Sequence, residues 1–156
     1  ERRLYYEMCW LTGASQTDVA NLTHENIKWA DGTLTYQRCK LPSDSKPAVM
    51  TIGMELKALI LKCPSKGPLF PTIIKTTVHT RSAEFSRRIR LLGLNGISLH
   101  SYRYAWAERA SAQGYPERWA CEALGHGSKA VHQAYARNAD VEVPSLEGYG
   151  KPYARN

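Results

Sequence analysis

Apolar and polar residues alternate along this chain in two rhythms, one typical of helices and the other typical of strands. Residues 1–11 repeat apolar positions at helical spacing and end at a Thr-Gly pair, and residues 15–22 fit a second, shorter helix. Within residues 27–39 an Asp-Gly turn lies between β-forming residues, which predicts a hairpin. Residues 48–52 predict a third strand, so we expect a small three-stranded antiparallel sheet.

From residue 54 onward the periodicity is almost entirely helical, and Pro or Gly residues mark the boundaries between the predicted helices. Ser128 can cap a last helix that carries Tyr135. The polar tail from Asp140 has no periodicity, which predicts an extended arm. The predicted fold class is α+β, mostly helical, with residues 1–139 as one domain and residues 140–156 as a C-terminal tail. The other helices are predicted over residues 54–62, 80–93, 99–113 and 116–124.

The length of 156 residues fits a single domain with a real hydrophobic core. No apolar run approaches the roughly 20 residues that a membrane-spanning helix needs, and the start lacks the pattern of a signal peptide. We therefore expect a cytoplasmic protein without membrane contacts. Because the chain opens with Glu1 rather than Met, and inside a helical pattern, we also expect a fragment of a longer protein.

The four cysteines form no recognisable metal or disulfide pattern. No Cys-x-x-Cys pair is present, whereas zinc sites and disulfide frameworks have closer or more regular spacing. We expect reduced thiols, as in a cytosolic protein.

The chain is strongly basic, with a net charge of +7 and an isoelectric point near 9.3. Such a balance suggests a polyanionic partner. The charge alone does not identify that partner, because many basic proteins bind no nucleic acid. The identity of the partner must therefore be inferred from the candidate functional side chains.

Two helical stretches carry side chains that could perform chemistry. His100 and Arg103 stand three positions apart on a predicted helix, so their side chains lie on one face. His126 follows a predicted helix end at Gly125, where glycine allows a tight turn. Tyr135 follows His126 by nine positions on the last predicted helix.

A third candidate lies on the predicted hairpin, where Arg38 and Lys40 alternate onto the same face of a strand. Each feature also has an ordinary structural explanation. A His–Arg pair can form a solvated helix face, a histidine after glycine can cap a helix, a lysine can protect a sheet edge, and a tyrosine can pack in the core. Only the combination of these residues favours a function.

Tyrosine, arginine, two histidines and lysine, without metal ligands, are the groups needed to transfer a phosphoryl group to a tyrosine. The phenol, whose pKa is ordinarily about 10, must lose its proton as it attacks. The transition state spreads negative charge over non-bridging oxygens, which arginine and histidine N–H groups can bind. The leaving alkoxide needs a proton, which a lysine can donate.

These stretches resemble the motifs of the tyrosine recombinases, the phage integrase family. The family motif HxLRHTFAT…G resembles LHSYRYAWAERASAQG, and the family ending LGHxxxxxTxxY resembles ALGHGSKAVHQAY, with the same nine-residue step. The segment TGLRISELLNLxxxDI resembles WLTGASQTDVANLTHENIKW more loosely, and the hairpin that follows fits the family's β-strand lysine. The resemblance extends in order from Leu4 to Arg137 and implies an integrase-like catalytic domain.

The resemblance implies a role for each matching residue. Tyr135 would attack the scissile DNA phosphate, form a 3′-phosphotyrosine link and release a 5′-hydroxyl. Arg103 would bind the non-bridging oxygens, and His126 would hydrogen-bond the phosphate. His100 would accept the tyrosine proton, and Lys40 would protonate the leaving 5′-oxygen.

The resemblance also implies partners. The family acts on double-stranded DNA without ATP, metal or another cofactor, and the full-length protein would assemble as a homo-tetramer on DNA. Family members usually carry a separate N-terminal domain that clamps DNA, and its absence here fits the expectation of a fragment. They often pass their C-terminal segment to a neighbouring subunit, so the tail 140–156 is a candidate exchange arm; an intramolecular or disordered tail stays an alternative.

One position departs from the family pattern, because Ser15 stands where the family has its first catalytic arginine. Removing one transition-state donor typically costs about 10²–10³ in rate. Three interpretations stay open: Arg38 replaces the missing arginine, Ser15 or Gln16 supplies neutral hydrogen bonds, or the domain is a relic that binds DNA without cutting it. The matches at the other catalytic positions favour an active or weakly active enzyme.

The basic helix over residues 80–93 supports DNA binding of either kind, because Arg81, Arg87 and Arg88 could follow a phosphate backbone. A solvated helix face is the structural alternative. Among other classes, a non-enzymatic DNA-binding module comes next, followed by a type IB topoisomerase and a helical interaction domain. The order of the motifs favours the recombinase.

Overall fold

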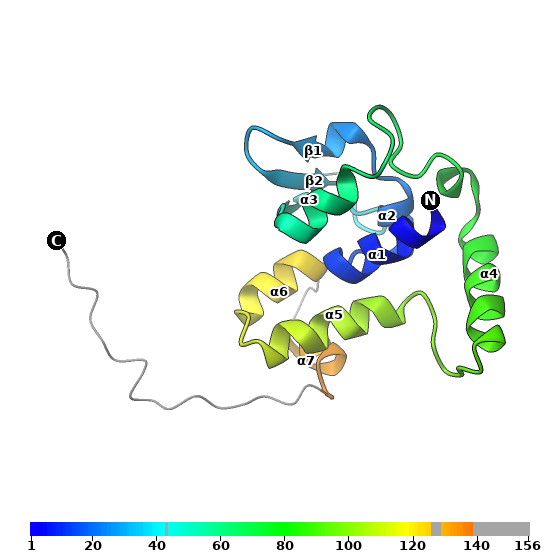
Figure 1. Ribbon diagram of the computed structural model, residues 1–156. Coiled ribbons are helices and arrows are strands. Elements are labelled where there is room, and N and C mark those ends of the chain that lie inside the picture. Colours follow the sequence, from blue (N-terminus) through cyan, green and yellow to red (C-terminus); the bar gives the residue numbers. More distant parts are fainter. Residues whose placement is uncertain (43, 126–128, 139–156) are drawn as a thin grey trace.

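The computed structural model describes residues 1–42, 44–125 and 129–138 (Figure 1). Its strands are β1 (Ile27–Lys28), β2 (Thr33–Tyr36) and β3 (Ala48–Thr51). Its α-helices are α1 (Arg2–Thr12), α2 (Gln16–Ala20), α3 (Met54–Ile60), α4 (Val78–Leu91), α5 (Ser101–Ala112), α6 (Glu117–Leu124) and α7 (Lys129–Tyr135). Two 3-10 turns, η1 (His24–Asn26) and η2 (Ile73–Lys75), complete the described elements.

The predicted α+β class is confirmed, because helices dominate the described residues and the three strands form one antiparallel sheet in the order β1-β2-β3. In the central strand, Leu34 is paired with Ile27 of β1 and with Met50 of β3. Figure 1 shows the sheet and α3 above α1, with α5, α6 and α7 below it and α4 standing at the edge of the molecule.

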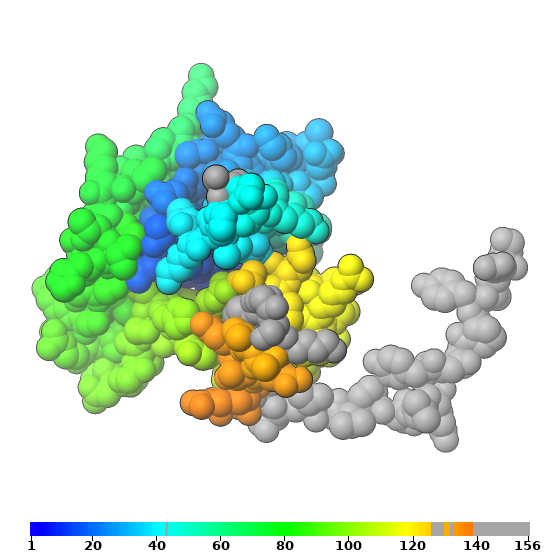
Figure 2. Space-filling view, turned by 180° about the vertical axis from the view of Figure 1, so that it is seen from behind, coloured from blue at the N-terminus to red at the C-terminus, as the bar shows by residue number. Residues whose placement is uncertain are grey.

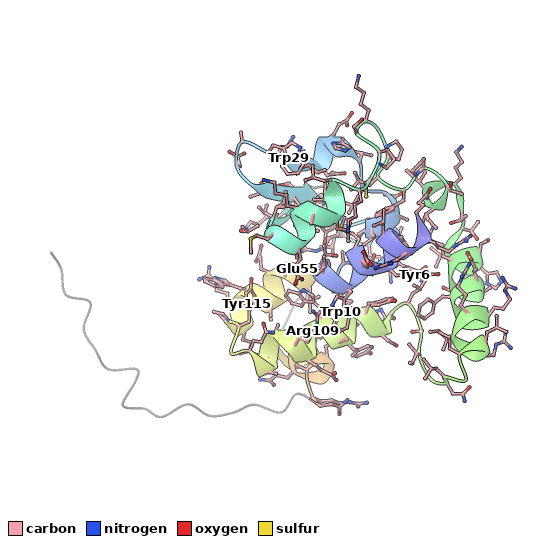
Figure 3. All side chains as sticks on the ribbon, in the orientation of Figure 1. Tyr6, Trp10, Trp29, Glu55, Arg109 and Tyr115 are labelled. Carbon is pink, nitrogen blue, oxygen red and sulfur yellow. The ribbon has the colours of Figure 1, made fainter. Side chains whose placement is uncertain are left out.

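The hydrophobic core lies where α1 meets the sheet, α3 and α5. α1 packs against α2, α3 and α5, and its side chains Tyr5 and Met8 are fully buried. Leu34 of β2 and Phe70, in the connection after α3, are also fully buried. Tyr6, labelled in Figure 3, contacts aromatic rings of α4 and α5 and extends this core to α4.

Two helices, α4 and α5, begin two residues away from the predicted start, because side chains set their first turns. α4 begins at Val78, since the Thr77 side chain accepts a hydrogen bond of 3.1 Å from the Thr80 amide and caps the helix. In the turn before α5, the Ser98 amide donates to the Ser101 hydroxyl at 3.0 Å, and regular helix begins only at Ser101.

The described residues contain neither a membrane-crossing helix nor a cluster of metal ligands. None of their helices is both long and apolar enough to cross a bilayer. No group of three or more His, Cys, Asp or Glu side chains among them could hold a metal ion. All four cysteines carry free thiols.

Gly13 ends α1 in the left-handed region, with a φ of 63°. A Cβ at this position would lie 2.7 Å from Cγ of Trp106 and 2.9 Å from Cδ2 of Leu124. We expect Gly13→Ala to lower the free energy of unfolding by about 2–4 kcal/mol, because backbone strain and overpacking add. Urea denaturation measures this loss.

Gly32→Ala is the matched control, since Gly32 has a φ of 62° but no heavy atom within 4 Å of an added Cβ. Only the backbone strain of about 1–2 kcal/mol should appear there. Equal losses at the two positions would show that the contacts of Gly13 with α5 and α6 add nothing.

Candidate active site

A small pocket of about 100 Å³ lies where the α1–α2 junction, the loop after β2 and the N-terminal ends of α4 and α5 meet. Three residues predicted for catalysis, Lys40, His100 and Arg103, line it together with Ser15. In Figure 2 the loop after β2 (cyan) and α7 (orange), which carries Tyr135, appear on the same face of the molecule. The other lining residues are Ala14, Gln16, Thr17, Val78 and Leu99.

Tyr135 ends α7 and reaches the N-terminal end of α5. Its hydroxyl lies 2.9 Å from Nε2 of His100, within hydrogen-bonding distance. Its ring stacks on Tyr104, with centroids 4.3 Å apart, and the guanidinium carbon of Arg103 lies 5.8 Å from the ring centroid. The structure therefore places the predicted nucleophile beside the predicted proton acceptor and the predicted phosphate ligand.

Arg103 is half-buried and is held by backbone carbonyls on both sides. Its Nη1 donates to the Gly13 carbonyl at 3.0 Å, and its Nη2 donates to the Leu124 carbonyl. Burial lowers the pKa of Arg103, while the neighbouring Tyr135 opposes that effect. Since the guanidinium has five N–H groups, these two bonds leave donors for a phosphate.

His100 precedes the first turn of α5, and its side chain is partly exposed at the pocket. Partial burial, followed by the positive charges of Arg103 and Lys40, lowers the pKa of His100 below its ordinary value of 6.5. The imidazole is therefore mostly neutral at pH 7. A neutral imidazole can accept a proton from the tyrosine hydroxyl.

Ser15 caps α2 and also binds the buried carboxylate of Asp18, a residue that the sequence motifs did not identify. The Ser15 hydroxyl donates to Oδ2 of Asp18 at 2.7 Å and accepts from the Asp18 amide at 3.2 Å. Oδ1 of Asp18 accepts from the Cys39 amide at 2.7 Å, which fixes the residue before Lys40. An acidic residue three positions after a serine N-cap was the signal that could have identified this carboxylate.

The two proposed substitutes for the missing arginine differ in position. Arg38 does not line the pocket; its Nη2 donates to the carbonyls of Glu122 and Ala123 at the end of α6. Gln16 lines the pocket, and its Nε2 donates to Ser82 at 3.2 Å. Gln16 and Ser15 are thus the two candidates for a neutral hydrogen bond that stand at the pocket itself.

One of the α4 arginines predicted to contact a DNA backbone, Arg81, does not fit that prediction. Arg81 is buried, with 6% of its surface exposed, and donates to the Thr76 carbonyl at 2.5 Å, so it does not fit the predicted contact with a DNA backbone. The charge pattern predicted a basic helix but not which arginine turns inward. Arg88 is at the surface in an ion pair of 3.0 Å with Glu84, and Arg87 is exposed. His126 lies outside the described residues.

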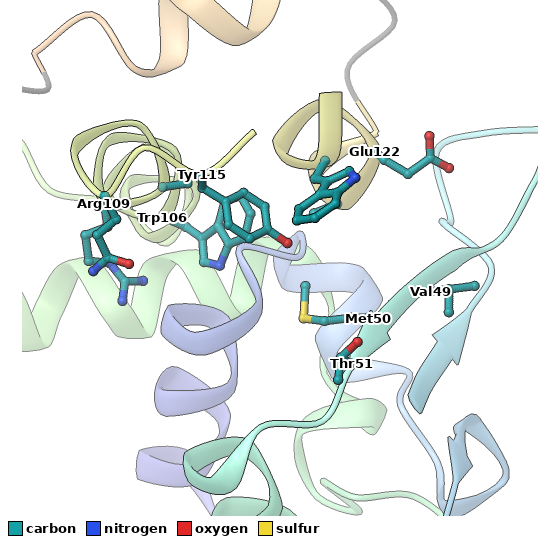
Figure 4. Close-up of a pocket in the computed structure, with 11 residues that line it drawn as sticks. Val49, Met50, Thr51, Trp106, Arg109, Tyr115 and Glu122 are labelled. Atoms are coloured by element: carbon teal, nitrogen blue, oxygen red, sulfur yellow. The ribbon is translucent and has the colours of Figure 1, made fainter. Parts of the chain in front are cut away.

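A larger pocket of about 350 Å³ lies between β3, α5 and α6 (Figure 4). Its walls include Met50, Trp106 and Tyr115, and Glu122 stands on one side. None of the predicted catalytic residues lines it. Lys40, His100 and Arg103 line the smaller pocket instead.

Several solved structures of site-specific recombinases and integrases have a similar fold. A XerH site-specific recombinase bound to a palindromic difH substrate, in a post-cleavage complex, matches with 17% identity and a TM-score of 0.67, over 90% of this chain and 43% of that one. A lambda integrase dimer bound to a COC′ core site matches with 21% identity and a TM-score of 0.69, over 92% and 45%. The catalytic domain of bacteriophage HP1 integrase matches with 21% identity and a TM-score of 0.63, over 86% and 73%.

This chain spans less than half the length of the XerH and lambda integrase chains that it matches. No protein-family model and no curated protein sequence matches it significantly. The comparisons confirm the fold that the sequence resemblance implied.

Proposed function

We propose that this chain, which has the fold of the tyrosine recombinase catalytic domains, cleaves and rejoins DNA strands through a 3′-phosphotyrosine intermediate on Tyr135. The observation that carries the proposal is the 2.9 Å contact between the Tyr135 hydroxyl and Nε2 of His100, at a site that also holds Arg103 and Lys40. A core tyrosine would have no need of a histidine at its hydroxyl, with an arginine and a lysine close to that histidine.

In the proposed reaction, the Tyr135 oxygen attacks the scissile phosphorus while its proton passes to His100. The non-bridging oxygens gain negative charge, which N–H groups of Arg103 that are not bonded to the two carbonyls bind. The bond to the 5′-oxygen breaks, and Lys40 supplies the proton that this oxygen needs. Rejoining reverses each step, so the energy of the broken bond is kept in the phosphotyrosine. His126 is proposed, from the resemblance, to hydrogen-bond the same phosphate.

Double-stranded DNA is the proposed substrate, in keeping with the net charge of +7 and with the substrates of the similar structures. Arg87 on the exposed side of α4, together with Arg88, is proposed to contact its backbone, so affinity should fall steeply as salt rises. Assembly of the full-length protein into a tetramer on DNA belongs to the same proposal. The tail 140–156, proposed as an exchange arm, lies outside the described residues.

A relic that binds DNA without cutting it is the second candidate function. The position of Ser15 favours it, because no arginine side chain other than Arg103 lines the described pocket. The two candidates differ in one product, the covalent protein–DNA adduct, while both bind DNA.

The test is therefore to locate a covalent adduct. Cells that express the chain are lysed under denaturing conditions, DNA that stays attached to the protein is trimmed with nuclease, and tryptic peptides are analysed by mass spectrometry. We expect a nucleotide mass on the peptide of residues 130–137, AVHQAYAR, whose only tyrosine is Tyr135. DNA binding without any adduct would support the relic, and an adduct on another peptide would contradict the assignment of the nucleophile.

The pH dependence of adduct formation should reflect His100. Only the neutral imidazole accepts a proton, so the rate should rise as the pH increases through the lowered pKa of His100 and then level off. The midpoint of the rise should lie below 6.5, the ordinary histidine value. Single-turnover rates between pH 5 and about 8 measure it; a midpoint above 6.5 would contradict the role of His100 as acceptor.

A further inference from the structure

We propose that Arg38 is a positioning residue for Arg103, which it serves by holding the last turn of α6. The proposal rests on the proposed function and adds a residue to the same site. Arg38 follows β2 and stands two positions before Lys40, whereas Arg103 belongs to α5. The two arginines reach α6 from different parts of the fold and bind it together.

The carbonyls at the end of α6 are divided between the two guanidinium groups. Arg38 donates to the carbonyls of Glu122 and Ala123, and Arg103 donates to the carbonyl of Leu124. The last four carbonyls of a helix have no partner within it, and the helix dipole makes this end negative. Two cations on three consecutive carbonyls therefore neutralise this end and fix its direction.

Gly125 shows how closely Arg38 lies on the end of α6. It ends the helix in the left-handed region, with a φ of 65°. A Cβ there would lie 2.6 Å from Nε and 2.8 Å from Cδ of Arg38, so the arginine occupies the space that a side chain at position 125 would need. Arg38 is therefore packed against this helix end as well as hydrogen-bonded to it.

The direction of the Arg103 guanidinium depends on this helix end. Two backbone carbonyls of the described residues orient the group, those of Gly13 and Leu124, and the Leu124 carbonyl is carried by the turn that Arg38 holds. If that turn loosens, Arg103 keeps its charge but loses the plane in which its remaining N–H groups face the pocket. A misplacement of about 1 Å at a reacting group can lower a rate on the order of 100-fold.

This arrangement differs from the interpretation in which Arg38 replaces the missing first arginine. A substitute would have to bind the phosphate directly, and adding an arginine at position 15 would then make Arg38 dispensable. A positioning residue stays necessary whatever stands at position 15. The two roles therefore give opposite results in one double-variant experiment.

The experiment measures single-turnover cleavage of nicked duplexes that contain the DNA sequence recovered by covalent capture. The variants are Arg38→Gln, Ser15→Arg and their combination. We expect Arg38→Gln to slow cleavage tenfold to about 100-fold, by the same factor in the unchanged chain and in the Ser15→Arg chain. DNA affinity should change less than about threefold, since Arg38 contacts no phosphate in this proposal. If the Ser15→Arg chain cleaved equally fast with arginine and with glutamine at position 38, the positioning role would be overturned in favour of a substitute arginine.

A second double variant tests whether Arg38 acts through Arg103. Arg103→Gln combined with Arg38→Gln should cleave no more slowly than Arg103→Gln alone, because residues that act as one unit give non-additive losses. If the two losses of cleavage rate multiplied in the double variant, the proposal would be overturned. Arg109→Gln is the matched control, because Arg109 also binds a backbone carbonyl, that of Trp10, and its loss changes the net charge equally.

Hydrogen exchange of the α6 amides tests the clamp without DNA. Arg38→Gln should speed exchange at the end of α6 severalfold while leaving exchange in α1 unchanged, and Arg109→Gln should not affect α6. Unchanged exchange at α6 would overturn the proposal even if cleavage slowed. If neither the unchanged chain nor the Ser15→Arg chain forms an adduct, the proposed function fails; the exchange result then still decides whether Arg38 holds α6.

Discussion

Replacing Tyr135 with Phe should abolish the covalent protein–DNA adduct. The change removes one oxygen, the proposed nucleophile, and loss of a catalytic nucleophile can cost on the order of 10⁶ in rate. The ring that stacks on Tyr104 at 4.3 Å is kept, so the α5–α7 contact and DNA binding should persist. Denaturing gels of protein with labelled DNA measure the adduct, and filter binding measures the affinity.

Tyr104→Phe is the matched control, because the Tyr104 ring stacks on that of Tyr135, contacts the His100 ring edge-on and also carries a hydroxyl. Its adduct should form at close to the rate of the unchanged chain. An adduct that survived Tyr135→Phe but vanished in Tyr104→Phe would transfer the nucleophile to α5 and refute the proposed site.

Ser15→Arg should accelerate adduct formation about 10²–10³-fold, the usual worth of one transition-state donor. Position 15 lines the pocket with Lys40, His100 and Arg103, so a longer side chain there can point toward the phosphate. The Asp18 carboxylate, 2.7 Å from the Ser15 hydroxyl, provides a negative charge for the guanidinium. Single-turnover rates of the two chains on the same DNA measure the gain.

The same change should cost about 1 kcal/mol of stability, because it removes the serine cap of α2. Ser15→Ala separates this loss from the gain in rate, since it removes the cap and adds no charge. Ser15→Lys adds the charge without the planar fork of arginine and should recover only part of the rate. A Ser15→Arg chain no faster than Ser15→Ala would mean that charge at this position is not what limits the reaction.

The elements of the fold were predictable because each has a local cause. The change from helical to alternating periodicity after residue 27 identified the hairpin, and glycines marked the ends of α1 and α6. The starts of α4 and α5 were displaced by two residues, because hydroxyl–amide bonds such as that from the Thr80 amide to Thr77 decide which residue begins a helix. Periodicity does not detect such bonds.

The candidate site was predictable only in part. The spacing of His100 and Arg103 placed them on one helix face, but their contact with Tyr135 depends on how α7 packs on α5. The charge pattern of a helix does not show which of its charged side chains are buried, so Arg81 was assigned to the surface although it is buried. The direction of Arg38 toward α6 depends on tertiary packing, which strand alternation does not determine.

The buried Asp18 has a consequence for the descent of this protein. Its carboxylate keeps, next to Ser15, the negative charge that would balance an arginine. If Ser15→Arg restores the rate as expected, no second substitution is needed to accommodate the new guanidinium. The slower and the faster enzyme would then be separated by one mutational step, and a lineage that carries the serine could gain the faster rate by that single substitution.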